Sequence, residues 1–262
     1  MDMTIQRIID TLGLEPLPAE GRMRISTHSP FHRDWTGMNA LVAGFALTVS
    51  SISTMQAQVL VSFPTPDGGI VYAHEYGGGS HGVVLAHGGR FTKESWGVQA
   101  LALEAEGFRV LAIDFRGRGR SRGPDSASGE PRYEFDVLGA VRYLRATGAA
   151  DVSVVGASFG GWAAAQASVE GEPGQIDRLV LLAHSPIAEP ERMHGRKLFI
   201  TSRDDFSGDG VLRLPDIRDQ YRRAPGPKEL VILEGDTHAQ FLFDTNQGDR
   251  LLNEIVRFLS EP

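Results

Sequence analysis

Short apolar runs alternate with amphipathic segments from Gln58 to the end of the chain. Eight of these runs predict strands, over residues 58–63, 70–76, 82–87, 109–115, 152–158, 178–184, 197–202 and 229–235. Short Gly- and Pro-rich turns join the first three runs, which favours an antiparallel start. The later runs lack polar alternation, which is typical of strands covered by helices on both faces.

Helical patterns occupy the intervals between these strands. They predict helices over residues 94–106, 133–147, 159–170, 216–223 and 246–259. Alternation of strands and helices favours an α/β fold with a mostly parallel eight-stranded sheet and helices on both faces. Only about ten residues separate the sixth strand from the seventh, near the minimum for a crossover. We therefore expect no lid domain and an open site.

The first part of the chain does not follow this pattern. Residues 1–57 are interpreted as an N-terminal appendage of unknown role, and residues 58–262 as the main domain. No charged residue or histidine occurs from Trp35 to Pro66, so the stretch Met38–Met55 could be read as a membrane helix or signal anchor. Its Ser, Thr and Asn residues and its β-branched residues suit strands better than a lipid-facing helix.

Composition narrows the function classes. The 262 residues include no cysteine, which excludes a disulfide framework, a thiolate nucleophile and a cysteine-ligated metal, and which suits a reducing cytoplasm. The formal net charge of −7 gives no electrostatic reason to bind nucleic acid or an anionic membrane surface. Composition does not indicate an oligomeric state.

One serine has the setting of a nucleophile. In "VSVVGASFGGWAAAQ", Ser158 follows an apolar run and precedes an alanine-rich one, with Gly156 and Gly160 two residues to either side. A serine that attacks a carbonyl must project clear of the sheet, and a tight strand-to-helix turn achieves this when its neighbours are small. The motif in this strand-turn-helix setting predicts a nucleophile elbow.

Candidate partners follow in later loops. Asp204 and Asp205 come directly after the seventh strand, and His238 comes after the eighth strand in "GDTHAQF". The order nucleophile, acid, histidine is the one that this kind of turn requires. Because the two aspartates are adjacent, only one of them is expected to face the histidine, and Asp209 on the same loop is a further candidate.

Two backbone amides could stabilise a developing oxyanion. Gly88 and Gly89 in "AHGGRF" follow the third strand and allow N–H groups to turn toward the serine. The N–H of Phe159, directly after Ser158, would supply the second donor.

These motifs together resemble the α/β-hydrolase superfamily. The resemblance covers Gln58 to Pro262, about four fifths of the chain, and rests on "HGG", "DFRGRGRS", "GASFGG" and "GDTH" in family order. It implies Ser158 as nucleophile, Asp205 as acid, His238 as base, and Gly89 with Phe159 as the oxyanion hole. Without a lid, the chain is most similar to dienelactone hydrolases, acyl-protein thioesterases and small carboxylesterases, although dienelactone hydrolases use a cysteine nucleophile.

The resulting hypothesis is a serine hydrolase that cleaves a carboxylic ester or thioester of a small molecule, with no metal or organic cofactor implied. Peptide or amide hydrolysis by the same residues, a lipid esterase, and a ligand-binding protein on a hydrolase scaffold are the alternatives. The arginines at 116, 118, 120 and 122 could bind a carboxylate or phosphate, or could simply pair with acidic neighbours. His184 is expected to line the pocket or to bond a loop carbonyl.

Overall fold

Eight strands form one sheet in the computed structural model, which describes residues 58–125 and 129–261. The strands are β1 (Val59–Pro64), β2 (Ile70–Tyr76), β3 (His81–Ala86), β4 (Arg109–Ile113), β5 (Asp151–Ala157), β6 (Arg178–Leu182), β7 (Arg196–Ser202) and β8 (Lys228–Leu233). Each lies within two residues of its predicted position, so the predicted α/β fold is confirmed.

The strand order is β1-β2-β4-β3-β5-β6-β7-β8. β1 pairs antiparallel with β2, and β2 pairs antiparallel with β4. All other pairs are parallel. The expected antiparallel start is therefore wrong for β3, which lies between β4 and β5. The physical reason is burial: β3 is almost completely buried along its length, so it needs a neighbouring strand on both sides.

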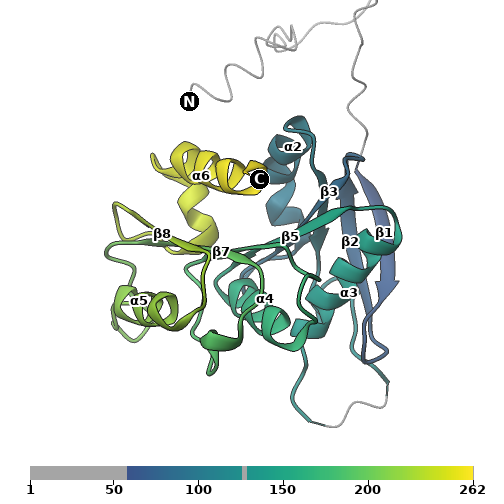
Figure 1. Ribbon diagram of the computed structural model, residues 1–262, viewed down its shortest axis with the longest axis horizontal. Coiled ribbons are helices and arrows are strands. Elements are labelled where there is room, and N and C mark those ends of the chain that lie inside the picture. Colours follow the sequence, from purple (N-terminus) through teal and green to yellow (C-terminus); the bar gives the residue numbers. More distant parts are fainter. Residues whose placement is uncertain (1–57, 126–128, 262) are drawn as a thin grey trace, which may run out of the picture. The chain divides into compact units, whose positions relative to one another are not determined.

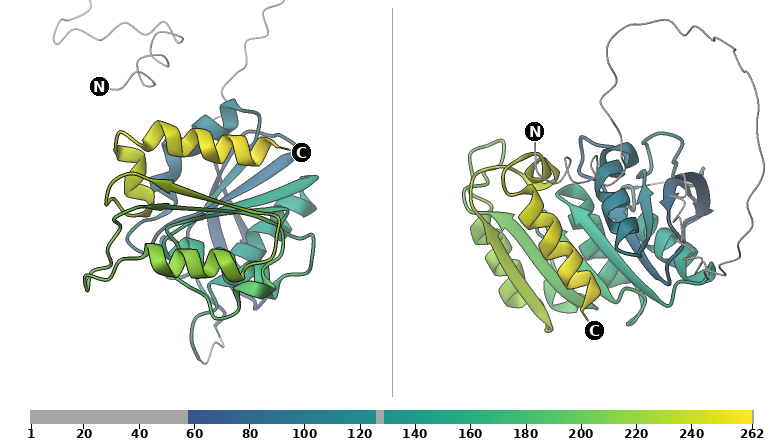
Figure 2. Two further views of the ribbon diagram at one scale, coloured as in Figure 1. Left: turned by 60° about the vertical axis from the view of Figure 1, so that its left-hand side comes forward. Right: turned by 90° about the horizontal axis from the view of Figure 1, so that it is seen from above.

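Helices cover both faces of the sheet (Figures 1 and 2). α3 (Glu134–Ala146), α4 (Phe159–Glu170) and α5 (Leu214–Arg223) lie on one face. α2 (Gly97–Ala105) and α6 (Gly248–Ser260) lie on the other. Successive β3 residues serve the two cores alternately, with Val84 and Ala86 in one and Val83 and Leu85 in the other. The sheet is thus the middle layer of three.

Three short 3-10 helices complete the described elements: η1 (Lys93–Trp96), η2 (Pro190–Arg192) and η3 (Ala239–Asp244). η2 is the one helical turn in residues 183–195, which join β6 to β7. This fully described connection carries no lid domain. Because β3 to β8 run parallel, the loops that follow them, with the predicted site residues, meet at one edge of the sheet.

The predicted appendage, residues 1–57, and the stretch Met38–Met55 lie outside the described residues. Within residues 58–125 and 129–261, no helix has both the length and the apolar character needed to cross a bilayer.

Candidate active site

Ser158 lies in a strained turn between β5 and α4. Its φ of 51° and ψ of −114° fall where an L-residue seldom lies, a conformation that costs on the order of 1–3 kcal/mol. Its backbone N–H donates to the Leu182 carbonyl at the end of β6, at 2.8 Å. The turn directs the hydroxyl away from the strand, and the side chain stays partly exposed.

The glycines around Ser158 are required by close packing. A Cβ on Gly156 would lie 2.5 Å from the Gly160 carbonyl oxygen. A Cβ on Gly160 would clash with the carbonyl oxygen of Ala86, at the end of β3. Only glycine lets the start of α4 approach both strands, and this approach brings Ser158 beside the loop that follows β3.

Three predicted residues meet in one hydrogen-bonded chain. The His238 Nε2 lies 2.8 Å from the Ser158 Oγ, and the His238 Nδ1 lies 2.7 Å from the Asp205 Oδ2. An ionised carboxylate can only accept, so Nδ1 carries the proton and Nε2 is left to accept the serine proton. The residues come from three loops, after β5, β7 and β8, yet lie within direct contact distance.

The two aspartates have different environments. Asp205 is completely buried, and its Oδ1 lies 3.5 Å from the Arg213 Nε. Asp204 is exposed, and Asp209 accepts a hydrogen bond from Ser207 on the loop surface. The geometry therefore favours Asp205 as the partner of the histidine. Arg213, which the sequence did not single out, is the positive charge that faces this buried carboxylate.

Of the two glycine amides in the loop after β3, one has no hydrogen-bond partner among the described residues. The Gly88 N–H donates to the Gln240 Oε1 at 2.7 Å, and the Gly88 carbonyl accepts from the His87 Nδ1 at 2.9 Å. The Gly89 carbonyl accepts from the Arg118 guanidinium. Among the described residues, the Gly89 N–H has no hydrogen-bond partner. Of the two glycine amides considered from the sequence, only this one is available to an oxyanion.

Phe159 lies beside Gly89. Phe159 is the first residue of α4, so its N–H has no partner within the helix. A Cβ on Gly89 would lie 3.8 Å from the Phe159 Cβ, which places the two residues in van der Waals contact range. Two unpaired donors beside Ser158 are the arrangement that a tetrahedral intermediate requires.

Gln240 links the histidine loop to the Gly88 loop. Besides accepting from Gly88, it donates through Nε2 to the Ser95 Oγ at 3.0 Å. Its side chain is buried, with 6% of its surface exposed. The sequence analysis missed Gln240; the available signal was a polar residue two positions after His238 in an otherwise apolar turn.

His87 makes hydrogen bonds to this loop and to the Phe115 backbone through its two ring nitrogens. Its Nδ1 donates to Gly88, and its Nε2 accepts from the Phe115 N–H at 3.3 Å. Burial lowers the pKa of His87, which favours the neutral ring. One tautomer therefore satisfies both contacts.

Of the two roles expected for His184, the bond to a loop carbonyl is not found. It is fully buried behind α4 and packs against the Phe199 ring at a centroid distance of 5.5 Å. Neither ring nitrogen has a hydrogen-bond partner of good geometry among the described residues, so the expected bond to a loop carbonyl is wrong. The Gln220 amide faces the ring, but it already bonds both the N–H and the carbonyl of Ile187. Burial lowers the pKa of His184 to about 4.

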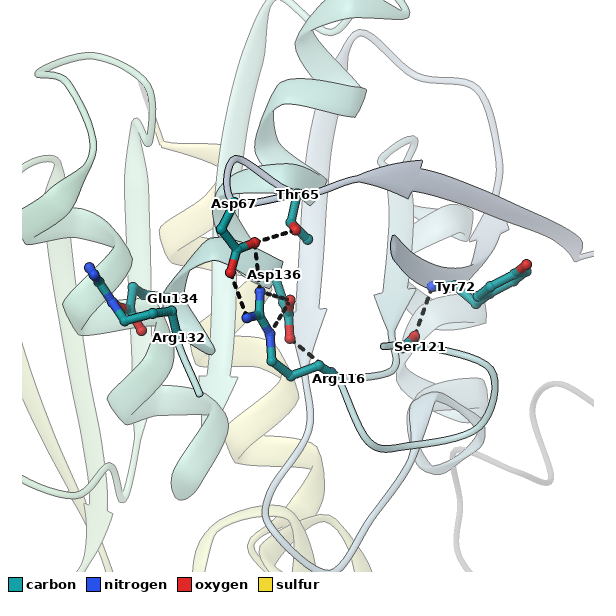
Figure 3. A network of polar contacts seen from close by, with 8 residues as sticks. All are labelled: Thr65, Asp67, Tyr72, Arg116, Ser121, Arg132, Glu134 and Asp136. Carbon is teal, nitrogen blue, oxygen red and sulfur yellow. Dashed lines mark hydrogen bonds and ion pairs between the residues drawn. The ribbon is translucent and has the colours of Figure 1, made fainter. Parts of the chain in front are cut away.

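Arg116 pairs with acidic neighbours. It bonds Asp136 through Nε at 2.9 Å and Asp67 through Nη1 at 2.7 Å (Figure 3). Burial alone would raise the pKa of Asp67, but hydrogen bonds from Arg116 and Thr65 outweigh it and lower that pKa to about 2. The charge of Arg116 is thus compensated within the protein.

The rest of the arginine loop folds back on β2. Ser121 accepts the Tyr72 N–H at 2.8 Å (Figure 3), and the Arg120 guanidinium lies over the Tyr72 ring at 4.3 Å.

Within the described part of the chain, no group of three or more histidine, aspartate or glutamate side chains could hold a metal ion.

One family model matches more than half of the chain. The model of the alpha/beta hydrolase family matches residues 83–256. A non-heme chloroperoxidase of Streptomyces lividans is 34% identical over 104 residues, which cover 40% of this chain and 37% of that protein. A non-heme haloperoxidase of Rhodococcus erythropolis is 31% identical over 120 residues, which cover 46% and 42%. The chain thus spans less than half the length of these curated relatives.

Solved structures share the fold. An esterase of Pyrococcus furiosus superposes with a TM-score of 0.62 at 18% identity, over 79% of this chain and 92% of that chain. An esterase of Exiguobacterium antarcticum superposes with a TM-score of 0.63 at 14% identity, over 78% and 100%.

Proposed function

Since this chain belongs to the alpha/beta hydrolase family, we propose that it is a serine hydrolase that cleaves a carboxylic ester or thioester of a small molecule. The observation that carries the proposal is the hydrogen-bonded chain from Ser158 through His238 to Asp205. A serine, a base within hydrogen-bond reach and a buried acid that orients the base make up the minimal equipment for acyl transfer.

In the proposed reaction, the Ser158 Oγ attacks the substrate carbonyl while the His238 Nε2 takes its proton. His238 then protonates the departing alcohol or thiol, which leaves an acyl group on the serine. Water enters next, loses a proton to the same nitrogen and releases the acid. Asp205 holds the Nδ1 tautomer and stabilises the imidazolium that forms in both halves.

The oxyanion is stabilised by the Gly89 and Phe159 amides. The choice of the Gly89 N–H is supported by the hydrogen bonds around it, because every other polar group of the Gly88 and Gly89 backbone has a partner. A donor fixed in place before the reaction costs no reorganisation as charge develops, and one such donor is worth about 3 to 4 kcal/mol in a related oxyanion hole.

A substrate panel tests this function. We expect turnover of 4-nitrophenyl esters and of thioesters of matched acyl length, weak or no turnover of aminoacyl anilides, and none with Ser158→Ala. Preference for the anilides would instead support a peptidase or amidase with the same residues. Absence of turnover on every member, by folded protein, would support the non-catalytic alternative.

Similarity to two haloperoxidases favours a second candidate activity. Hydrogen peroxide would replace water in the second half-reaction, so that the acyl serine yields free Ser158 and a peracid. The peracid would oxidise halide to hypohalous acid and revert to the carboxylic acid. Halogenation that requires both peroxide and a carboxylic acid, and that Ser158→Ala abolishes, is the expected result.

The proposal includes a cytoplasmic location, supported by the absence of cysteine from the sequence.

A further inference from the structure

A cavity of about 320 Å³ adjoins the proposed oxyanion donors. Gly89 and Phe159, which carry the two free amides, both contribute to its wall. A carbonyl bound at these amides would therefore extend one of its substituents into the cavity. The volume lies at the lower end of the range for small-molecule sites, so the substituent must be compact.

Aromatic rings form one side of this cavity. Phe115, Tyr133 and Phe159 line it and meet edge to face, with centroids 4.8 Å apart for Tyr133 and Phe159 and 5.2 Å apart for Phe115 and Phe159. Trp162 stacks on Phe159 with the ring centroids 5.7 Å apart. Such rings offer faces and edges that suit a planar unsaturated group, and their mutual packing holds them in place before a ligand arrives.

Two arginines also line the cavity, and only one of them pairs with carboxylates of the described residues. Arg116 is neutralised by Asp67 and Asp136 (Figure 3). Arg118 is exposed, and no carboxylate of the described residues lies within ion-pair distance of it. Among the described residues, its side chain makes one hydrogen bond, from Nη2 to the Gly89 carbonyl. A guanidinium carries several N–H donors in a planar fork, so the remaining donors of Arg118 are available to a ligand.

We propose that the cavity binds a planar aromatic or unsaturated group that bears a carboxylate, with Arg118 holding the carboxylate. This inference rests on the proposed function and names the substrate class of that site: esters in which the acyl or the alcohol part is a compact carboxylated aromatic group.

The anion is assigned as a carboxylate for reasons of charge. Arg118 is the one uncompensated cation among the described residues of the cavity wall, and one guanidinium neutralises one carboxylate. A phosphate carries nearly twice that charge at neutral pH and would need a second cation. The protein as a whole has a net charge of −7, so an anionic substrate needs a local positive group.

Binding of this carboxylate would also affect the reacting centre. Arg118 contacts the Gly89 carbonyl, on the residue whose N–H faces the oxyanion. A carboxylate that fixes the guanidinium therefore also fixes this residue, so the correct substrate would steady one oxyanion donor.

The test uses two pairs of esters that differ only in a carboxylate or its carboxamide isostere. One pair changes the acyl part, with 4-nitrophenyl esters of terephthalic acid and of 4-carbamoylbenzoic acid. The other changes the leaving group, with 4-carboxyphenyl and 4-carbamoylphenyl acetate. The kcat/KM for each ester is divided by the rate at which that ester hydrolyses without enzyme. The ratio of this value for the carboxylate to that for the carboxamide is then compared between variants.

Wild-type enzyme is expected to prefer the carboxylate in one pair by about tenfold to a hundredfold, the range of a charge-assisted hydrogen bond. Arg118→Met should bring that ratio close to one. Arg122→Met is the matched control, because Arg122 is exposed on the same loop but does not line the cavity, and it should keep the wild-type ratio. Thermal unfolding confirms that both variants fold.

Equal rates within both pairs for wild type, or a preference that survives Arg118→Met, would overturn the inference. Equal losses on carboxylate and carboxamide would also overturn it, since Arg118 would then act through Gly89 alone. Calorimetric titration of the uncleaving Ser158→Ala variant with the same esters separates this inference from the proposed function: tighter binding of the carboxylate member supports the inference even without turnover, and equal binding refutes it.

Discussion

Replacing Gln240 by leucine should damage catalysis more than its distance from the reacting atoms suggests. Leucine keeps the bulk of the side chain but removes its bonds to the Gly88 N–H and the Ser95 hydroxyl. The buried Gly88 N–H is left without a partner, which costs about 1–3 kcal/mol, and the second bond is worth about 1 kcal/mol. The free energy of unfolding should therefore fall by about 2–4 kcal/mol, and Tm by roughly 4–16 °C.

The variant should also lose catalytic activity, independently of its loss of stability. Loss of a whole oxyanion donor costs about a hundredfold to a thousandfold in kcat, and Gln240 bonds Gly88, the residue before the proposed donor, without being a donor to the oxyanion itself. We expect kcat for a small 4-nitrophenyl ester to fall by about tenfold to a hundredfold with KM little changed, measured well below Tm. Gln99→Leu, on α2, is the control, because Gln99 is partly buried but its side chain makes no hydrogen bond with the described residues. A Gln240→Leu enzyme that is less stable but has wild-type kcat would refute the positioning role.

Three further predictions test other parts of the site and fold. Asp205→Asn should lower kcat by about ten-thousand-fold, because the imidazole then adopts the wrong tautomer, whereas Asp204→Asn should be near normal; the reverse pattern, on protein shown to be folded by circular dichroism, would contradict the assignment. His184 has its pKa lowered from 6.5 to about 4 in the folded state, so the unfolded chain takes up its proton first as pH falls. Above pH 6.5 the protonation of His184 should leave the free energy of unfolding unchanged, and between pH 6.5 and pH 4 it should lower that free energy by about 3 kcal/mol. His184→Leu should remove this decline in urea titrations at each pH, and an unchanged dependence of the free energy of unfolding on pH in this variant would count against it. A chain that begins near Ala57 should keep the kcat and KM of the full chain, because every residue of the proposed site lies beyond Gln58; a folded truncation without turnover on small esters would show that the boundary is misplaced.

Local signals account for the parts of the fold that could be predicted. α4 begins at Phe159 as expected, because glycines and a strained serine mark the turn before it. The pairing of β3 was predicted wrongly, because the glycines before it are typical of a hairpin, whereas burial on both faces decides which strands lie beside it. Pairing between strands depends on contacts that no single segment encodes.

The same limit applies to the site. Ser158 and His238 stand in motifs whose spacing indicates their chemistry, and the structure brings them within hydrogen-bond distance. Gln240 could not be singled out, because its partner, the Gly88 N–H, is distant in sequence. Arg118 was one of four arginines that could bind an anion, and only the structure separates it from Arg116, which pairs with Asp67 and Asp136. Their roles follow from which loops the sheet brings together.

The central claim, that Ser158 is a nucleophile activated by His238, is tested most directly by a fluorophosphonate probe and intact-mass measurement. The account predicts one phosphonyl adduct on the folded wild-type protein, mapped by peptide sequencing to Ser158, with slow labelling of His238→Ala and none of Ser158→Ala. No adduct on folded protein, or an adduct on another residue that persists in Ser158→Ala, would contradict it.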